Sequence, residues 1–187
     1  MPVEYLEEYD RYVMIAGIRD IRICDAETAL QRLRGSEGGL ETQLFDVKGV
    51  AGREHLRFAV LNALKAWASG KQLTSSVAVE VLLYASGQRQ IKNAIMALGV
   101  SPNSKNLAVT SIASDRHMLE RFEADLPSIL GGKLDETVLD EGDELAIRRI
   151  FGITDNQVRA LVTSRVTERE AVIGLVIERM ALLSVQT

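Results

Sequence analysis

Basic side chains gather in one stretch of this otherwise acidic chain, and their type suits the binding of a ligand. Residues 48–105 contain eight Lys or Arg and only two Asp or Glu, a net charge of +6. Because the 187-residue chain carries −4 in total, the remaining residues sum to −10. A local positive region on an acidic protein is the pattern expected of a polyanion site. A Lys-rich, solvated helix surface is the alternative interpretation of charge alone.

The candidate contacts centre on a predicted break between two helices at Gly87, which permits close approach of a backbone. Arg89 and Lys92 are three residues apart, so on a helix beginning at position 88 they point the same way. The first turn of that helix would also offer free N–H donors to a phosphate. A single-stranded RNA end suits such a site, because polar side chains read unstacked bases while Arg and Lys meet the phosphates. The candidate RNA contacts are Arg89, Gln90, Lys92, Lys71, Arg53 and Lys65.

Structural roles compete with binding roles at several of these positions. Arg89 could instead neutralise Glu80, the lone charge on a largely apolar helix, since an unpaired buried carboxylate is costly. His55 lies near a helix start and is interpreted as a packed, hydrogen-bonded residue. Trp67 lies on an apolar stripe and is interpreted as core. Tyr84 could stack on a base, but its helix is predicted to be buried, so core is favoured there too.

The sequence contains no motif typical of catalysis or of metal binding. It has no Walker-type phosphate loop, no GxGxxG after a strand, no HExxH and no GxSxG. Its two histidines, His55 and His117, form no cluster with its single cysteine. The acidic run 140–144 suits the positive end of a helix dipole better than a cation, because its spacing is not convergent. We therefore expect no catalytic residue, no metal, no cofactor and no small-molecule substrate.

Length and composition favour one domain over residues 1–187. A hydrophobic content of 47% is enough for a core, and no apolar run reaches the roughly 20 residues that span a bilayer. The acidic start lacks the basic-then-apolar pattern of a signal peptide. Cys24 is the only cysteine, so an intramolecular disulfide is impossible. Together these features predict a cytoplasmic protein that does not enter a membrane.

Three consecutive helices, over 52–68, 75–85 and 88–98, are predicted to position the basic residues. Alternating or β-branched patterns predict strands over 12–23, 40–47 and 107–113. Further helices are predicted over 25–34, 115–126 (ended by Pro127), 140–151 and 168–185, with a possible short strand within 126–139. Capping boxes are predicted at Thr154 and Thr167. The fold class is α/β or α+β: a small mixed or antiparallel sheet flanked by about seven helices in a single domain.

The stretch from 45 to 100 resembles the PRPK-binding protein family. The resemblance rests on two runs, which read GxxHLxxAxxNALxAW and VEVLLYASGQRQIKNAIMALGV. Its most distinctive piece is EVLLYASGQRQI, residues 80–91. Outside 45–100 the strand, helix and length pattern is compatible with the family, whereas the N-terminal segment and the acidic stretch 135–144 match no pattern.

The resemblance implies a non-catalytic subunit of the KEOPS complex, which makes threonylcarbamoyladenosine in certain tRNAs. Such a subunit binds the PRPK-type (Bud-type) kinase and grips the 3′ CCA end of tRNA. It would place RNA contacts at Arg89, Gln90 and Lys92, with Lys71, Arg53 and Lys65 as further contacts. The kinase surface is expected to be apolar and built partly from the C-terminal helix. The alternative is a protein–protein adaptor that activates or stabilises the kinase without touching RNA.

Overall fold

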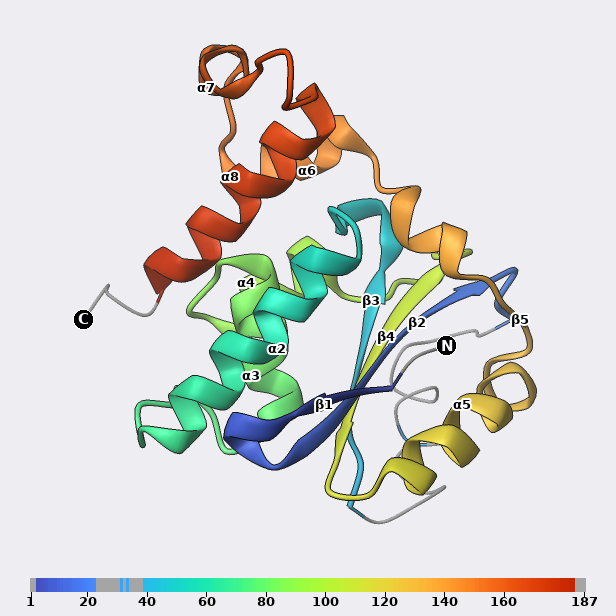
Figure 1. Cartoon of the computed structure of the whole chain (residues 1–187). Helices are drawn as coiled ribbons and strands as arrows, with labels where there is room; N and C mark the ends of the chain where they lie inside the picture. The colour runs from blue at the N-terminus through green and yellow to red at the C-terminus, as the bar shows by residue number, and fades with distance from the viewer. Residues whose placement is uncertain (1–2, 23–30, 32, 34–38, 184–187) are drawn as a thin grey trace.

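A five-stranded antiparallel sheet forms the centre of the computed structural model (Figure 1), which describes residues 3–22, 31, 33 and 39–183. The strands are β1 (Glu4–Leu6), β2 (Arg11–Arg19), β3 (Glu41–Asp46), β4 (Leu107–Ala113) and β5 (Lys133–Leu134). The strand order is β1-β2-β4-β3, and β5 pairs with β2. The antiparallel sheet confirms one of the two predicted options. The prediction omitted β1, whose residues lack a strong alternating pattern.

Helices cover both faces of the sheet. The described residues form seven α-helices: α2 (Arg53–Ala68), α3 (Val77–Ser86), α4 (Ile91–Leu98), α5 (Arg116–Leu130), α6 (Glu144–Phe151), α7 (Asp155–Leu161) and α8 (Glu168–Leu183). Short 3-10 turns are η1 (Glu7–Tyr9), η2 (Val47–Gly49) and η3 (Glu136–Asp140). In Figure 1, α5 lies on one side of the sheet, and α2, α3 and α4 lie on the other. The α+β class with about seven helices is confirmed.

Alternation along β2 divides the core between these two faces. Val13 and Ile15 pack with α2, α3 and α8, whereas Met14 and Ile18 pack with α5. Successive side chains of a strand point to opposite faces, so a central strand covered on both sides is apolar throughout. All seven residues of β4 are accordingly buried.

Two helix boundaries differ from the predicted ones. The helix predicted from 88 begins at Ile91, because Gly87 caps α3 in the left-handed conformation (φ 63°) and the next three residues form the connection. The helix predicted to end before Pro127 continues to Leu130, with Pro127 in its last turns. Pro127 lacks an N–H for the helix ladder but does not end the helix, and Gly131, in the left-handed conformation, provides the stop instead.

Other predictions can be compared directly. The predicted capping box at Thr154 is confirmed, and Thr167 forms the same reciprocal bonds with Glu170. Of the helix predicted over 25–34, only Gln31 and Leu33 are among the described residues. Within the described part of the chain, no helix has the length and apolarity that crossing a membrane requires.

The helices α6 and α7 and the first turn of α8, residues 144–170, form an arm that projects from the body (Figure 1). A connection from β5 through η3 leads into it. This connection is tied to β2 at Gly17, where Asp135 N–H donates to the carbonyl of Gly17 at 2.9 Å. A Cβ at Gly17 would lie only 2.3 Å from the carbonyl oxygen of Asp135, so the approach requires glycine.

Candidate RNA-binding and protein-docking surfaces

The predicted RNA contacts fall into three separate places on α2, α3 and α4. Arg89, Gln90 and Lys92 lie at the end of α3 and the start of α4. Lys65 and Lys71 lie at the opposite end of α3, which is ten residues and therefore roughly 15 Å long. Arg53 opens α2, twelve residues and roughly 18 Å along that helix from Lys65. The structure thus brings together the first three residues and separates the others.

Arg89 and Lys92 are exposed, and no hydrogen bond or ion pair engages either side chain within the described residues. Arg89 precedes α4 and is not on the same helix as Lys92, which corrects the predicted geometry. Gln90 is the N-cap residue of α4, but its side chain makes no capping bond. The N–H groups of the first turn of α4 therefore have no side-chain cap.

Glu80 does not pair with Arg89, so that alternative interpretation is wrong. The Glu80 side chain is completely buried, and its carboxylate accepts hydrogen bonds from Leu73 N–H and Thr74 N–H at 3.0–3.1 Å. The hydroxyl of Thr74 adds another bond at 3.0 Å. Backbone donors thus satisfy the buried carboxylate. The same bonds fix the loop before α3, which carries the exposed Lys71, and leave Arg89 unpaired.

Arg53 is engaged within the fold. Its guanidinium donates to Glu136 at 2.7 Å and to the carbonyl of Ile15 at 2.9 Å. It therefore joins α2 to β2 and η3. Lys65 and Lys71, in contrast, are exposed, and no partner of either ammonium group lies within the described residues.

His55, Tyr84 and Trp67 can now be assigned. His55 is fully buried: its Nδ1 accepts from Ala51 N–H at 3.0 Å, and its Nε2 lies 2.7 Å from the carbonyl of Ala85. Burial lowers the pKa of His55 to about 4, so the imidazole is neutral at pH 7. The packed role predicted for His55 and the core role of Tyr84 are confirmed. Trp67 is only partly buried, and its indole N–H is enclosed without a hydrogen-bond partner.

The outer face of α4 is apolar, which sequence reasoning did not anticipate. Only some of the apolar residues of α4 are covered: Ala94 and Leu98 are buried, whereas Ile91, Ile95 and Met96 are 46%, 52% and 71% exposed. These three share the outer face with Lys92, since residues three and four apart are neighbours on a helix. We call Arg89, Gln90, Ile91, Lys92, Ile95 and Met96 the α4 surface. The sequence does carry a signal for this exposed face: α4 has more apolar residues than a single buried face needs.

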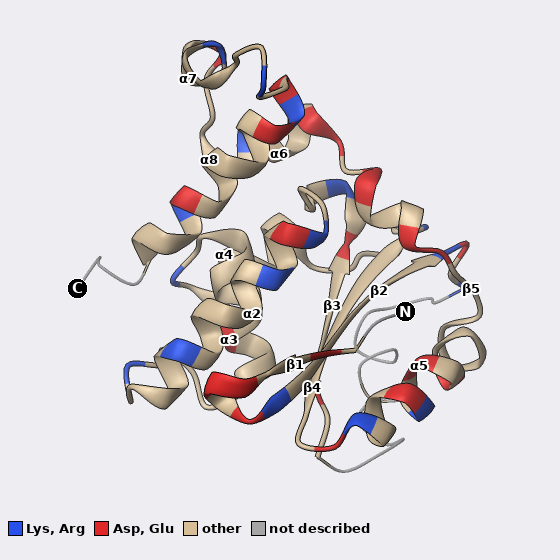
Figure 2. Cartoon of the chain, in the orientation of Figure 1, with Lys and Arg blue, Asp and Glu red and all other residues tan. Residues whose placement is uncertain are grey.

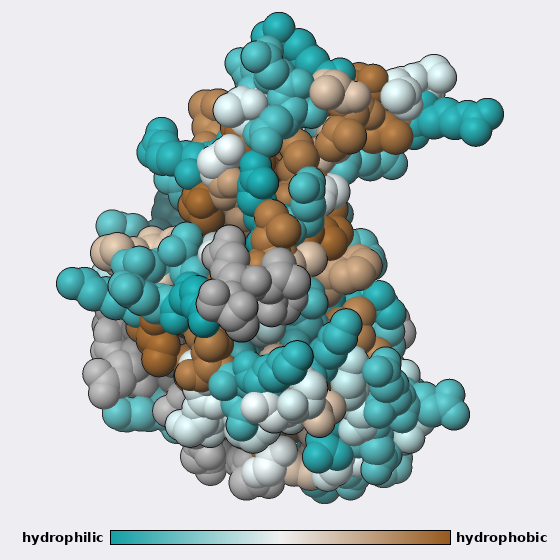
Figure 3. Space-filling view, turned by 90° about the vertical axis from the view of Figure 1, so that its left-hand side faces the viewer, coloured by the Kyte–Doolittle hydropathy of each residue, from teal (hydrophilic) through white to brown (hydrophobic). Residues whose placement is uncertain are grey.

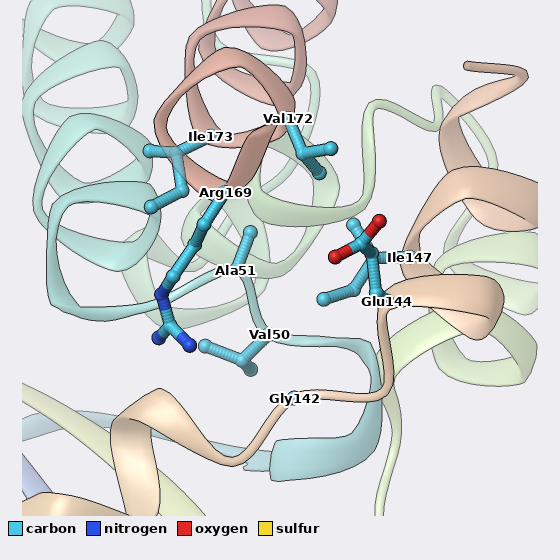
Figure 4. A pocket seen from close by; sticks show the side chains of 8 residues that line it. All are labelled: Val50, Ala51, Gly142, Glu144, Ile147, Arg169, Val172 and Ile173. Carbon is cyan, nitrogen blue, oxygen red and sulfur yellow. The ribbon is translucent and has the colours of Figure 1, made fainter. Parts of the chain in front are cut away.

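A second apolar region lies between the arm and α2. A small pocket there is lined by Val50, Ala51, Gly142, Glu144, Ile147, Arg169, Val172 and Ile173 (Figure 4). Arg169 reaches across it from α8 to bind Asp140, while Glu144 stands on the opposite side at the start of α6. In Figure 3 the arm overhangs the body, and apolar residues gather in the hollow beneath it.

The acidic segment, residues 135–144, is internally neutralised. Arg19 binds Asp135 at 2.7 Å and Glu141 at 2.5 Å. Other arginines pair with the remaining carboxylates except Asp143: these pairs are Arg53–Glu136, Arg169–Asp140 and Arg148–Glu144. The Asp143 side chain instead caps α6. The expected helix-start role holds for Asp143, and no group of three potential metal ligands occurs among the described residues.

Within the described residues, the structure is an α+β fold that exposes a basic-apolar surface on α4 and an apolar hollow between the arm and α2. Comparison with known proteins specifies it further. A family model described as kinase binding protein CGI-121 matches residues 22–184. Regulatory protein Cgi121 from Methanocaldococcus jannaschii is 32% identical over 167 residues, which cover 87% of this chain and 98% of that protein. The chain belongs to the CGI-121 kinase binding protein family, which confirms the resemblance found in residues 45–100.

Proposed function

We propose that this chain is a non-catalytic, cytoplasmic KEOPS subunit that binds a Bud-type kinase and recruits tRNA through its 3′ CCA end for threonylcarbamoyladenosine synthesis. The family description supports the kinase partner. The α4 surface supports the RNA partner. The observation that carries the RNA proposal is that exposed apolar side chains lie beside two cations that have no ion-pair partner within the described residues.

The apolar half of the α4 surface suits unstacked bases. Ile91 and Ile95 are one helical turn apart, and Met96 lies beside Ile95 on the same exposed face. A single-stranded RNA end offers flat base faces that lose contact with water when they lie against apolar groups. Double-stranded RNA would present its phosphates instead and leave these side chains in water. The exposed apolar face therefore favours the single-stranded 3′ end as the ligand.

The polar half suits phosphates. Arg89 and Lys92 flank the first turn of α4, whose N–H groups are free of a side-chain cap. Guanidinium, ammonium and helix N-terminal N–H groups all favour a phosphate at this position. Gln90 remains available for a base edge or ribose, because among the described residues its side chain accepts only one long hydrogen bond, of 3.4 Å, from Asn93. Lys71 and Lys65 lie farther away and would add long-range attraction, and Arg53 is committed to Glu136.

The decisive experiment measures binding to one tRNA prepared with and without its terminal CCA. The wild-type protein should bind the CCA-ended form more tightly, and the variant Arg89→Ala/Lys92→Ala should lose about tenfold or more in affinity. Two phosphate contacts contribute about 1.4 to the slope of log K against log salt, so the variant should also show a shallower slope. The matched control is Lys65→Ala/Lys71→Ala, which removes the same charge at the other end of α3 and should bind more nearly like wild type.

Ile95→Asp tests the apolar half separately, because it adds a charge to a residue that is already half exposed. It should weaken binding to CCA-ended tRNA while leaving the fold intact. A protein that binds neither tRNA but still binds the kinase would be the adaptor without RNA contact. If Arg89→Ala/Lys92→Ala kept its fold and bound CCA-ended tRNA as tightly as wild type, the α4 surface would be excluded as the RNA-binding site.

For the kinase we propose the hollow between the arm and α2, together with the outer face of α8. Gly174 is exposed there, and a Cβ at this position would meet nothing within 4 Å. Ile173 and Ile177 flank it and are only partly buried. Leu182, 39% exposed, continues the face. This arrangement lets a partner approach the helix backbone closely and bury apolar side chains at the same time.

Gly174→Trp tests this docking surface with little effect on the fold, because the new side chain has open space. Kinase binding, measured by co-purification or calorimetry, should fall at least tenfold, whereas RNA binding should be unchanged. Ile95→Asp serves as the reciprocal control, since it should weaken RNA binding and preserve kinase binding. A Gly174→Trp protein that binds the kinase normally would place the interface elsewhere.

A further inference from the structure

A second basic cluster lies on the arm. Residues 148–166 contain four arginines and one aspartate, a net charge of +3 on a chain that carries −4. Arg149, Arg159 and Arg165 are exposed, and within the described residues no ion pair or side-chain hydrogen bond engages them. Arg148 is different, because it binds Glu144 at 2.6 Å and Asp155 at 2.7 Å. Because Asp155, the single aspartate of the segment, is bound to Arg148, no acidic residue within 148–166 remains to pair with the other three arginines.

The last turn of α6, which carries Arg149, packs against the segments on either side of α4. The ring of Phe151 lies 3.7 Å from the position of a Cβ at Gly87, in the connection that carries Arg89. Ile150 lies 3.1 Å from the corresponding position at Gly49, which also lies close to Leu98 and Ala97 at the end of α4. The last turn of α6 therefore touches the structure on both sides of α4, and Arg149 belongs to that turn. Arg159 lies in α7 and Arg165 lies in the loop before α8, so the charge extends along the arm. Figure 2 shows basic residues on α7.

We infer that the arm binds the phosphate backbone of the RNA duplex that adjoins the single-stranded 3′ end. This inference rests on the proposed function, because it needs the α4 surface to hold that end. Arginine meets phosphate oxygens with two parallel N–H donors, and a row of them follows a backbone without reading its sequence. The arm projects from the body, so its tip can reach RNA that the α4 surface does not touch. The acidic segment is already paired with arginines and does not oppose an RNA on this side.

Charge complementarity favours RNA over an acidic protein as the occupant. Asn156, Thr163 and Ser164 are exposed between the arginines and supply the neutral donors typical of phosphate contacts. Two carboxylates line the same surface depression as Arg159. Asp155 is bound to Arg148, whereas Glu168 forms no ion pair within the described residues. Glu168 therefore provides a test of sign: its neutralisation should strengthen RNA binding.

The experiment compares three probes: a short single-stranded RNA ending in CCA, a hairpin duplex with a 3′ CCA tail, and full-length tRNA. Arg149→Ser/Arg159→Ser/Arg165→Ser should weaken binding to the hairpin and the tRNA at least tenfold and should leave the short RNA within about twofold. The slope of log K against log salt should fall by up to about 2.7 for three lost duplex contacts. Glu168→Gln should tighten hairpin binding about twofold, in the opposite direction to the arginine variant.

Arg11→Ser/Arg116→Ser/Lys133→Ser is the matched control, because it removes the same charge from β2, α5 and β5, away from the arm. It should bind all three probes nearly as wild type does. If the control and the arm variant lost RNA affinity equally, the loss would reflect net charge alone, and the inference would be overturned. The inference would also be overturned if the arm variant kept tRNA binding but no longer bound the kinase, since the arginines would then contact a protein.

The two proposals fail in different ways. If Arg89→Ala/Lys92→Ala weakens every probe while the arm variant weakens none, the proposed function stands and the inference about the arm is overturned. If the wild-type protein binds none of the three probes, both are overturned.

Discussion

The acidic segment and the α4 surface both carry several charged side chains, and they use these charges in opposite ways. In the acidic segment, five of six carboxylates pair with arginines from β2, α2, α6 and α8, and the sixth caps a helix. In the α4 surface, Arg89 and Lys92 have no partner within the described residues. Charges that are paired internally hold elements together, whereas unpaired charges beside exposed apolar groups are available to a ligand. The sum of −10 outside residues 48–105 therefore says little about the charge that surrounds the α4 surface.

Substitution of Glu80 should have the largest effect on stability, because this carboxylate is buried and satisfied by backbone donors. Glu80→Ala leaves the N–H groups of Leu73 and Thr74 without a partner, and the free energy of unfolding should fall by about 3 kcal/mol or more. Urea denaturation measures the change. Glu54→Ala is the control, since Glu54 is exposed on α2 and its loss should cost less than about 0.5 kcal/mol. Similar losses for both variants would contradict the role given to Glu80.

His55 extends the comparison between used and available charges, because it is a basic residue of α2 that carries no charge at pH 7. Its folded-state pKa of about 4 lies below the ordinary value of 6.5, so the unfolded chain binds the proton first as pH falls. Stability from this residue is complete above about pH 6.5 and should decline by roughly 3 kcal/mol on the way to pH 4. In His55→Gln the free energy of unfolding should no longer show this decline between about pH 6.5 and pH 4. The control His117→Gln should retain it, since His117 is exposed.

Arg19 tests the acidic segment directly. Hydrogen bonds from Thr137 and then from Arg19 lower the pKa of Asp135 to about 2, below the ordinary 3.8. This carboxylate therefore stabilises the fold above about pH 4, and its contribution disappears as pH falls toward 2. Arg19→Met should lower the melting temperature at pH 7, and the difference from wild type should shrink in acid. A difference that stayed constant from pH 7 to pH 2 would show that Arg19 acts through packing alone.

Local patterns in the sequence predicted the elements well where neighbours in the chain decide the outcome. The range of β4 was predicted to the residue, because a β-branched run buried on both faces leaves little choice. The start of α4 was missed, since Gly87 can end one helix without the next beginning at once. The sequence of α4 predicted a helix with one apolar face, but which of its apolar residues are covered depends on η2 and α6, which lie elsewhere in the chain.

Charge pairing could not be predicted from the sequence for the same reason. Arg53 meets Glu136, which lies 83 residues away, so no local pattern separates it from the free cations around it. The partners of Glu80 are close in sequence, but apart from the Thr74 hydroxyl they are backbone groups, which residue types do not reveal. Only the tertiary structure distinguishes a cation that is already used from one that is available.

Removal of the unpaired cations should have the smallest effect on stability, and its direction distinguishes a binding surface from a structural one. Arg89→Ala/Lys92→Ala breaks no ion pair within the described residues, so the free energy of unfolding should change by less than about 0.5 kcal/mol. Because residues 48–105 carry a net +6, relief of repulsion should make any change slightly stabilising at low salt and should vanish as salt screens it. Urea denaturation at two salt concentrations measures both. A loss above 1 kcal/mol would mean that these residues serve the fold, and the contrast with the acidic segment would not hold.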